Sequence, residues 1–145
     1  MHRRRVLLID DEVHIIMVLA RRLEKDGYEV HTAGDGVRGL ETAERVRPDV
    51  VVTDLQMPRL SGVEVAQQLA ASMPEVPVLL LTARGYVLGD YDIPQNVHEC
   101  LPKPFSAREI VAKLDALLGV NADASEGSTP RIGPEAAPED GKRVA

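Results

Sequence analysis

Three aspartates stand where two apolar runs of the sequence end. Asp10 and Asp11 directly follow the run at 6–9, and Asp54 follows the run at 50–52 after one threonine. Continuous Val, Leu and Ile runs are typical of strands buried on both faces of a parallel sheet. Ligands bind beyond the carboxyl ends of such strands, where the strand order reverses. If these two strands flank that point, the three carboxylates share one crevice.

Carboxylates that lie a few ångströms apart repel one another, and without a cation at least one of their pKa values rises. A hard divalent cation with oxygen ligands relieves this repulsion. Mg²⁺ suits a site with few carboxylates, because it keeps several waters and accepts phosphate oxygens. Such an ion also neutralises the charge that develops during phosphoryl transfer.

Two further polar residues are expected at the same edge of the sheet. Thr82 ends the apolar run at 78–81, and Lys103 follows the last predicted strand. A hydroxyl donor and an ammonium both suit a phosphoryl group. With the three aspartates they form a set of residues able to handle phosphate.

Each of these residues alone has a simpler interpretation. Asp10 and Asp11 could cap a helix, Thr82 could be an ordinary strand-end threonine, and Lys103 could be a solvated surface residue. Because all of them are expected at the same edge of the sheet as Asp54, the functional interpretation is favoured over the structural one.

The elements that position these residues alternate between strand and helix. We predict strands near residues 5–10, 28–32, 49–54, 77–82 and 98–101. Helical apolar spacing lies between them, with a glycine stop at Asp26-Gly27 and further stops at Pro48 and Pro74. Ser106 and Glu109 have the spacing of a capping box at the start of the last helix. This alternation predicts an α/β fold, a flavodoxin-like (βα)5 doubly wound parallel sheet of order 2-1-3-4-5.

Two segments depart from this regularity. The region at 84–97, where a fourth helix is expected, holds two glycines, two aspartates and a proline, so we expect an atypical helix that is short or irregular. Residues 120–145 are rich in Ala, Gly, Pro, Glu and Ser and are predicted to be a disordered tail. We therefore divide the chain into a domain at 1–119 and a tail at 120–145.

Composition excludes several classes of function. The 145 residues carry a net charge of -6, so nucleic-acid binding through this domain is not expected, and Arg3-Arg4-Arg5 is interpreted as a short solvated cluster. No apolar run reaches the roughly 20 residues of a membrane span or suits a secretory signal, so we expect a cytoplasmic protein with no membrane partner. The single cysteine, Cys100, excludes an internal disulfide, and its spacing from His98 does not complete a metal site.

At the positions of these acids the sequence resembles the receiver domain of two-component response regulators, of the single-domain type. The matching segments are 7–12, 52–58 with 61–62, 81–83 and 103–105, and the resemblance covers roughly residues 5–118. Each segment alone is a weak signal. Their order and spacing together make the resemblance specific.

The resemblance implies a role for each acid. Asp54 would be the phosphoacceptor and would form an acyl phosphate. Asp11 and Asp54 would bind Mg²⁺ directly, Asp10 through water or as a second ligand, and the backbone carbonyl of Gln56 would complete the protein ligands.

The resemblance also implies how the phosphoryl group is bound and reported. Lys103 would pair with a phosphoryl oxygen, Thr82 would move to hydrogen-bond the group, and the small Ala83 would leave the site open. The Lys103–Pro104 bond would be cis. Phosphorylation adds about -1.5 to -2 charges, which would bias a two-state equilibrium.

Some positions differ from the family pattern, and others are positions that affect the rate of dephosphorylation in the family. Cys100 stands where the family commonly has Tyr or Phe as a switch residue, so output could instead come from ordering of residues 84–97. Gln56 and Arg84 occupy the positions that tune dephosphorylation in the family, and a long Arg84 could shield the phosphoryl group from water.

Three classes of function follow. The first is a phosphorylated switch that serves a histidine kinase or phosphotransfer protein and a downstream protein partner, with dimerisation on phosphorylation left open. The second is a degenerate receiver that only binds proteins. The third is an enzyme on this fold, such as a phosphatase, but Gln56 stands where such an enzyme would need a second Asp. No output domain is expected after Gly119, and we expect a phosphoacceptor domain, not an enzyme.

Overall fold

The computed structural model describes residues 3–83, 92–103 and 105–119. The chain forms two compact units. The first is Met1–Val111, which holds the whole sheet, and the second begins at Ala112, within the last helix. All residues discussed below as a site belong to the first unit.

Five parallel strands form one sheet in the order β2-β1-β3-β4-β5. Their bounds are β1 (Arg5–Ile9), β2 (Glu29–Ala33), β3 (Val50–Asp54), β4 (Val78–Thr82) and β5 (Val97–Pro102). The apolar runs that predicted β1, β3 and β4 are buried along nearly their whole length. Both the strand positions and the strand order predicted from the sequence are therefore confirmed.

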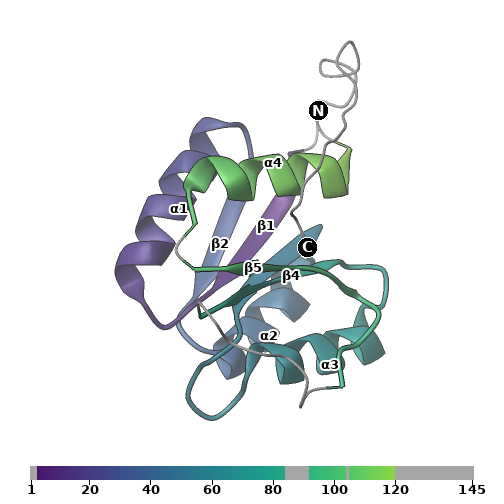
Figure 1. Ribbon diagram of the computed structural model, residues 1–145. Coiled ribbons are helices and arrows are strands. Elements are labelled where there is room, and N and C mark those ends of the chain that lie inside the picture. The colour runs from purple at the N-terminus through teal and green to yellow at the C-terminus, as the bar shows by residue number, and fades with distance from the viewer. Residues whose placement is uncertain (1–2, 84–91, 104, 120–145) are drawn as a thin grey trace, which may run out of the picture. The chain divides into compact units, whose positions relative to one another are not determined.

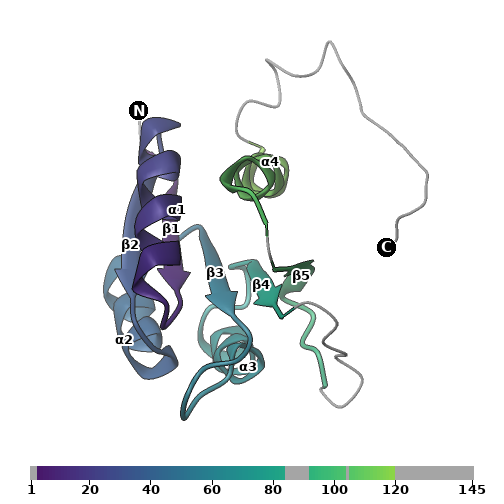
Figure 2. The same ribbon diagram turned by 60° about the vertical axis from the view of Figure 1, so that its left-hand side comes forward.

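Among the described residues of the first unit, three helices cover the sheet. They are α1 (Val13–Lys25), α2 (Gly36–Val46) and α3 (Gly62–Ser72). Figures 1 and 2 show α1 on one face of the sheet, with α2 and α3 side by side on the other. The last helix, α4 (Ala107–Leu118), crosses the boundary between the two units.

Local sequence explains where the helices begin and end. Gly27 adopts φ +100 directly after α1, as the glycine stop predicted. Ser61 and Glu64 form a capping box at the start of α3, with bonds of 2.8 and 3.2 Å. Ser106 and Glu109 form the predicted one before α4, with bonds of 2.9 and 3.1 Å.

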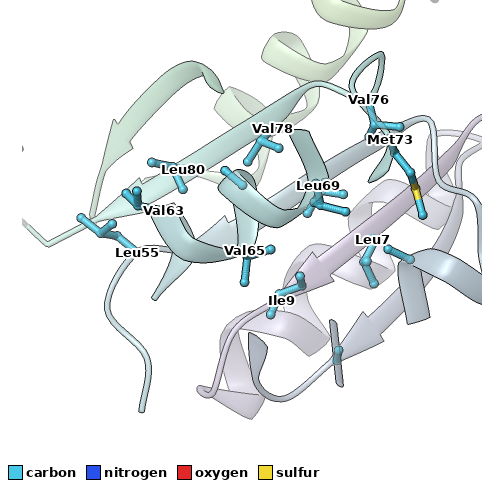
Figure 3. Close-up of a cluster of buried hydrophobic side chains, with 14 residues drawn as sticks. Leu7, Ile9, Leu55, Val63, Val65, Leu69, Met73, Val76, Val78 and Leu80 are labelled. Atoms are coloured by element: carbon cyan, nitrogen blue, oxygen red, sulfur yellow. The ribbon is translucent and has the colours of Figure 1, made fainter. Parts of the chain in front are cut away.

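The main hydrophobic cluster lies between the sheet and the helices α2 and α3 (Figure 3). Leu7 and Ile9 of β1 point into it, and Leu69 and Met73 meet them from α3 and its C-cap. Burial of such side chains contributes about 1.5–3 kcal/mol each. This packing fixes the positions of β1 and β3 in the sheet, and therefore the positions of the residues that follow them.

The segment before β5 is attached to α3 by a buried side chain. Residues 92–96 contain no helix, and the Asn96 amide Nδ2 donates a 2.9 Å hydrogen bond to the Ala66 carbonyl of α3. Most of the predicted irregular fourth helix, at 84–91, lies outside the described residues, as does the predicted tail at 120–145. Within the described part of the chain, no helix has the length and apolar character needed to cross a membrane.

Candidate functional site

The first two site carboxylates leave neighbouring strands at the same level. Ile9 of β1 pairs with Thr53 of β3, and the next residue of each strand is an aspartate, Asp10 or Asp54. The amide of Asp10 donates a 3.2 Å hydrogen bond to the Ala33 carbonyl at the end of β2. Since β1 lies between β2 and β3 (Figure 2), this position is where the strand order reverses, as predicted.

The three aspartates form one cluster. Carboxylate oxygens of Asp10, Asp11 and Asp54 all lie within 4.8 Å of one another. Asp10 and Asp54 are buried, whereas Asp11 is exposed at the mouth of the cluster. Among the described residues, this trio is the group of His, Cys, Asp and Glu with the spacing of a metal site.

Lys103 supplies the positive charge of the cluster. Its Nζ lies 3.2 Å from Asp54 Oδ1 and 3.5 Å from Asp10 Oδ2. It also lies 3.1 Å from Glu12 Oε1, and its side chain is only 20% exposed. One ammonium therefore faces three carboxylates in a partly desolvated site.

The ionisation of these groups follows from burial and from their mutual charges. Burial, together with the charge of Asp10, raises the pKa of Asp54 from 3.8 to about 6. Burial also raises the pKa of Asp10. Burial alone would lower the pKa of Lys103, but its hydrogen bond with Glu12 and the charges of Asp10 and Asp54 raise it. The cluster thus carries more negative charge than one lysine can balance.

The donor set fits a hard divalent cation. Oδ2 of Asp10 is buried and accepts no hydrogen bond, and its cationic neighbour, Lys103 Nζ, lies 3.5 Å away, beyond the distance of a good hydrogen bond. This oxygen belongs to the same carboxylate cluster as Asp11 and Asp54. A buried carboxylate oxygen without a hydrogen-bond partner is costly unless a cation or water satisfies it. All ligand atoms available here are oxygens, which Mg²⁺ prefers.

The structure places Thr82 and Ala83 beside this cluster through the neighbouring strands. Thr82 is the buried last residue of β4, and its carbonyl accepts a 2.6 Å hydrogen bond from the amide of Lys103. Ala83 follows it and is exposed. The sequence therefore placed both residues correctly at the edge where β3, β4 and β5 end.

The loop after Asp54 carries Gln56, which is exposed. This loop is anchored by the amide of Gly62, which donates a 2.8 Å hydrogen bond to the carbonyl of Leu55. Gly62 belongs to the matching segment 61–62, and its backbone packs against that of Asp54. Arg84 and Pro104 lie outside the described residues.

Cys100 lies on β5 and is half-buried against the hydrophobic cluster between the sheet and α3. Burial, helped by the charge of Glu99, raises the pKa of its thiol, so the thiol is less reactive than a free one. Cys100 is therefore a packing residue at the edge of this cluster.

Glu12 is the site residue that the sequence analysis missed. It was part of the matching segment 7–12, but no role was assigned to its carboxylate, which contacts Lys103. The signal was present in the sequence as a third consecutive acid after the first strand. Glu12 and Lys103 are 91 positions apart in the sequence, so their contact could be recognised only in the folded structure.

Comparison with known proteins agrees with this geometry. A family model described as the response regulator receiver domain matches residues 6–115. The response regulator MprA of Mycobacterium leprae is 42% identical over 115 residues, which cover 79% of this chain and 50% of MprA. The alkaline phosphatase synthesis transcriptional regulatory protein PhoP of Bacillus subtilis is 39% identical over 119 residues, covering 79% and 48%. The chain thus spans about half the length of these relatives.

Solved structures give the same result. A response regulator receiver domain protein from Clostridium thermocellum superposes with a TM-score of 0.72 at 29% identity, covering 83% of this chain and 98% of that one. The response regulator TrrA of Thermotoga maritima, in complex with Mg²⁺ and beryllium fluoride, has a TM-score of 0.69 at 31% identity, covering 79% and 98%. This chain belongs to the response regulator receiver domain family, a family of signal-transduction domains.

Proposed function

We propose that this chain is a phosphorylation-dependent signalling switch that accepts a phosphoryl group on Asp54 from a histidine kinase or a phosphotransfer protein. The observation that supports this most is the position of Lys103 Nζ, 3.2 Å from Asp54 Oδ1, beside three carboxylates within 4.8 Å of one another. An acceptor carboxylate, a cation and metal-ligating acids are the parts that phosphoryl transfer requires.

Each residue has a part in the proposed step. An oxygen of the Asp54 carboxylate attacks phosphorus, the new O–P bond forms as the bond from phosphorus to the donor nitrogen breaks, and the donor imidazole leaves. The Lys103 ammonium neutralises charge on the phosphoryl oxygens. The hydroxyl of Thr82, at the end of β4, then donates a hydrogen bond to a phosphoryl oxygen.

Asp10, Asp11 and Asp54, with the backbone carbonyl of Gln56, would hold Mg²⁺ in this site. When bound, the ion supplies positive charge for the developing phosphoryl charge and relieves the repulsion among the carboxylates. Support comes from the buried Oδ2 of Asp10, which accepts no hydrogen bond and has Lys103 Nζ only at 3.5 Å. Support also comes from a relative from Thermotoga maritima that was solved with Mg²⁺ and beryllium fluoride.

The switch acts through a change of population between two conformations. New phosphoryl oxygens attract Thr82 and Lys103, and the surface near β5 changes in response.

The readout is proposed to differ from the family pattern, because Cys100 stands in place of an aromatic switch residue. We propose that a downstream protein binds the segment at 84–97. We also propose that Arg84 slows loss of the phosphoryl group. Dimerisation on phosphorylation and a cytoplasmic location are further predictions.

The test of phosphorylation uses acetyl phosphate with Mg²⁺ and intact-mass spectrometry. We expect the wild-type protein to gain the mass of one phosphoryl group, and Asp54→Ala to gain none. Glu44→Gln, an exposed acid on α2, serves as the control and should label like wild type. Phosphotransfer from purified histidine kinases then identifies the donor.

The degenerate alternative predicts the opposite result. A receiver that only binds proteins would show no mass gain in the wild type, with or without Mg²⁺. Labelling of both the wild type and Asp54→Ala would also contradict the proposal, because the acceptor would then be another residue.

A further inference from the structure

The side chain of Glu12 occupies an unusual position at the start of α1. Glu12 is the N-cap residue of this helix, yet its carboxylate makes no capping hydrogen bond. It accepts a 3.1 Å hydrogen bond from Lys103 Nζ instead. A helix N-cap side chain commonly accepts from a backbone N–H of the first turn, so the orientation toward Lys103 forgoes that stabilisation.

The backbone of Glu12 is tied to the same site. Its amide donates a 2.9 Å hydrogen bond to Asp10 Oδ1, which fixes the residue beside the buried aspartate. The Glu12 side chain is 60% exposed, whereas that of Lys103 is 20% exposed and that of Asp54 is 9% exposed. Glu12 therefore holds Lys103 from the solvent side, and Asp54 holds it from the interior.

This arrangement divides one ammonium among three carboxylates. Lys103 has three N–H donors, and three carboxylates already lie within 3.5 Å of its Nζ. A phosphoryl group on Asp54 brings new acceptor oxygens that need the same donors. Any hydrogen bond that Lys103 keeps with Glu12 is then unavailable to the phosphoryl group.

We infer that Glu12 is a positioning residue that draws the Lys103 ammonium toward solvent and so sets the balance between metal binding and phosphoryl binding at Asp54. This inference rests on the proposed function. Two opposite consequences follow from it. Glu12 favours Mg²⁺ binding, because it withdraws a competing cation from Asp10 and Asp54, and it disfavours the phosphorylated state, because it competes for Lys103.

Glu12→Gln tests the inference with little risk to folding, because the side chain is mostly exposed and caps nothing. Calorimetric titration with Mg²⁺ alone should show a dissociation constant raised about two- to fivefold, a range typical of partly exposed ion pairs. Titration with beryllofluoride at saturating Mg²⁺, followed by ¹⁹F NMR, should show a dissociation constant lowered by about the same factor.

Two further variants separate contact from charge. Glu12→Asp keeps the negative charge but shortens the side chain by one methylene, so it loses contact with Lys103 and should behave like Glu12→Gln toward beryllofluoride. Glu44→Gln removes an exposed acid from α2 and should leave both constants unchanged.

The outcomes are distinct. Equal constants for Glu12→Gln and wild type, or shifts of both constants in the same direction, overturn the inference and leave the proposed function intact. Wild-type behaviour of Glu12→Asp also overturns it, because charge alone would then explain the effect. If the wild-type protein fails to bind beryllofluoride with Mg²⁺, the proposed function is overturned and this inference with it.

Discussion

Gly62 leaves no room for a side chain beside the backbone carbonyl oxygen of Asp54. A Cβ at position 62 would overlap that oxygen and lie 3.0 Å from the Leu55 α-carbon and from a methyl carbon of Leu80. Two of these neighbours are backbone atoms of the strand end that carries the acceptor, so they cannot move aside as a flexible side chain could. The first residue of α3 must therefore be glycine for Asp54 to keep its position.

Gly62→Ala should destabilise the protein by about 1–3 kcal/mol, the usual cost of forcing an extra methyl group into a packed site. Urea denaturation measures this change. Gly34→Ala is the matched control, since nothing lies within 4 Å of a Cβ there, and its effect should stay within about 0.5 kcal/mol. Equal stability of Gly62→Ala and wild type would contradict the packing described here.

Asp54→Asn should stabilise the metal-free protein at neutral pH. The pKa of Asp54 is raised to about 6 in the folded protein, above its ordinary value of 3.8. The folded state therefore retains the proton more strongly, and this stability is present below about pH 4 and lost as the pH rises through about 6. At pH 7.5 the neutral Asn avoids this loss, and we expect a gain of about 1–3 kcal/mol.

The pH dependence checks the cause of that gain. Urea denaturation without Mg²⁺ at pH 7.5 and at pH 4 should show the difference between Asp54→Asn and wild type shrinking toward zero at the lower pH. A gain that is the same at both values would mean that ionisation of Asp54 is not its source.

Mg²⁺ affinity should fall in acid, because protons and the metal compete for the same carboxylates. Below about pH 6, the dissociation constant for Mg²⁺ should rise by up to about tenfold for each pH unit, since the pKa of Asp54 is about 6 and that of Asp10 is also raised. Calorimetry between pH 7.5 and pH 5, with circular dichroism to confirm folding, measures this. A constant affinity across the range would contradict binding by these aspartates.

Asn96→Ala should loosen the attachment of the segment before β5. Its buried amide loses the 2.9 Å hydrogen bond to the Ala66 carbonyl, and we expect a loss of about 1–2 kcal/mol of stability, measured by denaturation. Gln67→Ala is the comparison, because its contact with the Asp92 carbonyl is exposed and 3.5 Å long. If the two variants cost the same, the buried bond is not the main attachment.

Much of the fold could be predicted because burial on both faces demands continuous apolar runs. The run at 6–9 and that at 78–81 became β1 and β4, and Gly27 ended α1 at the predicted place. The positions of Asp10, Asp54 and Lys103 followed from the same rule, since each comes at the carboxyl end of a parallel strand.

The remaining features depend on geometry that sequence patterns do not specify. Arg47 and Arg59 adopt positive φ, where sequence rules favour glycine. Arg59 is also paired with Asp35 at 3.1 Å, a contact between the loop after Asp54 and the N-cap of α2. The Glu12–Lys103 contact depends on side-chain rotamers at one crowded site. Such contacts join residues distant in sequence and leave no periodic signal.

The central claim is that Asp54 receives the phosphoryl group, and chemical trapping of the product tests it most directly. The protein is treated with acetyl phosphate and Mg²⁺, then with sodium borohydride, which reduces an acyl phosphate to an alcohol, and position 54 is examined by peptide mass spectrometry. We predict conversion of Asp54 to homoserine in the wild type, with no conversion when acetyl phosphate is omitted. Unmodified Asp54 together with a modified carboxylate elsewhere, or no modification at all, would contradict the claim.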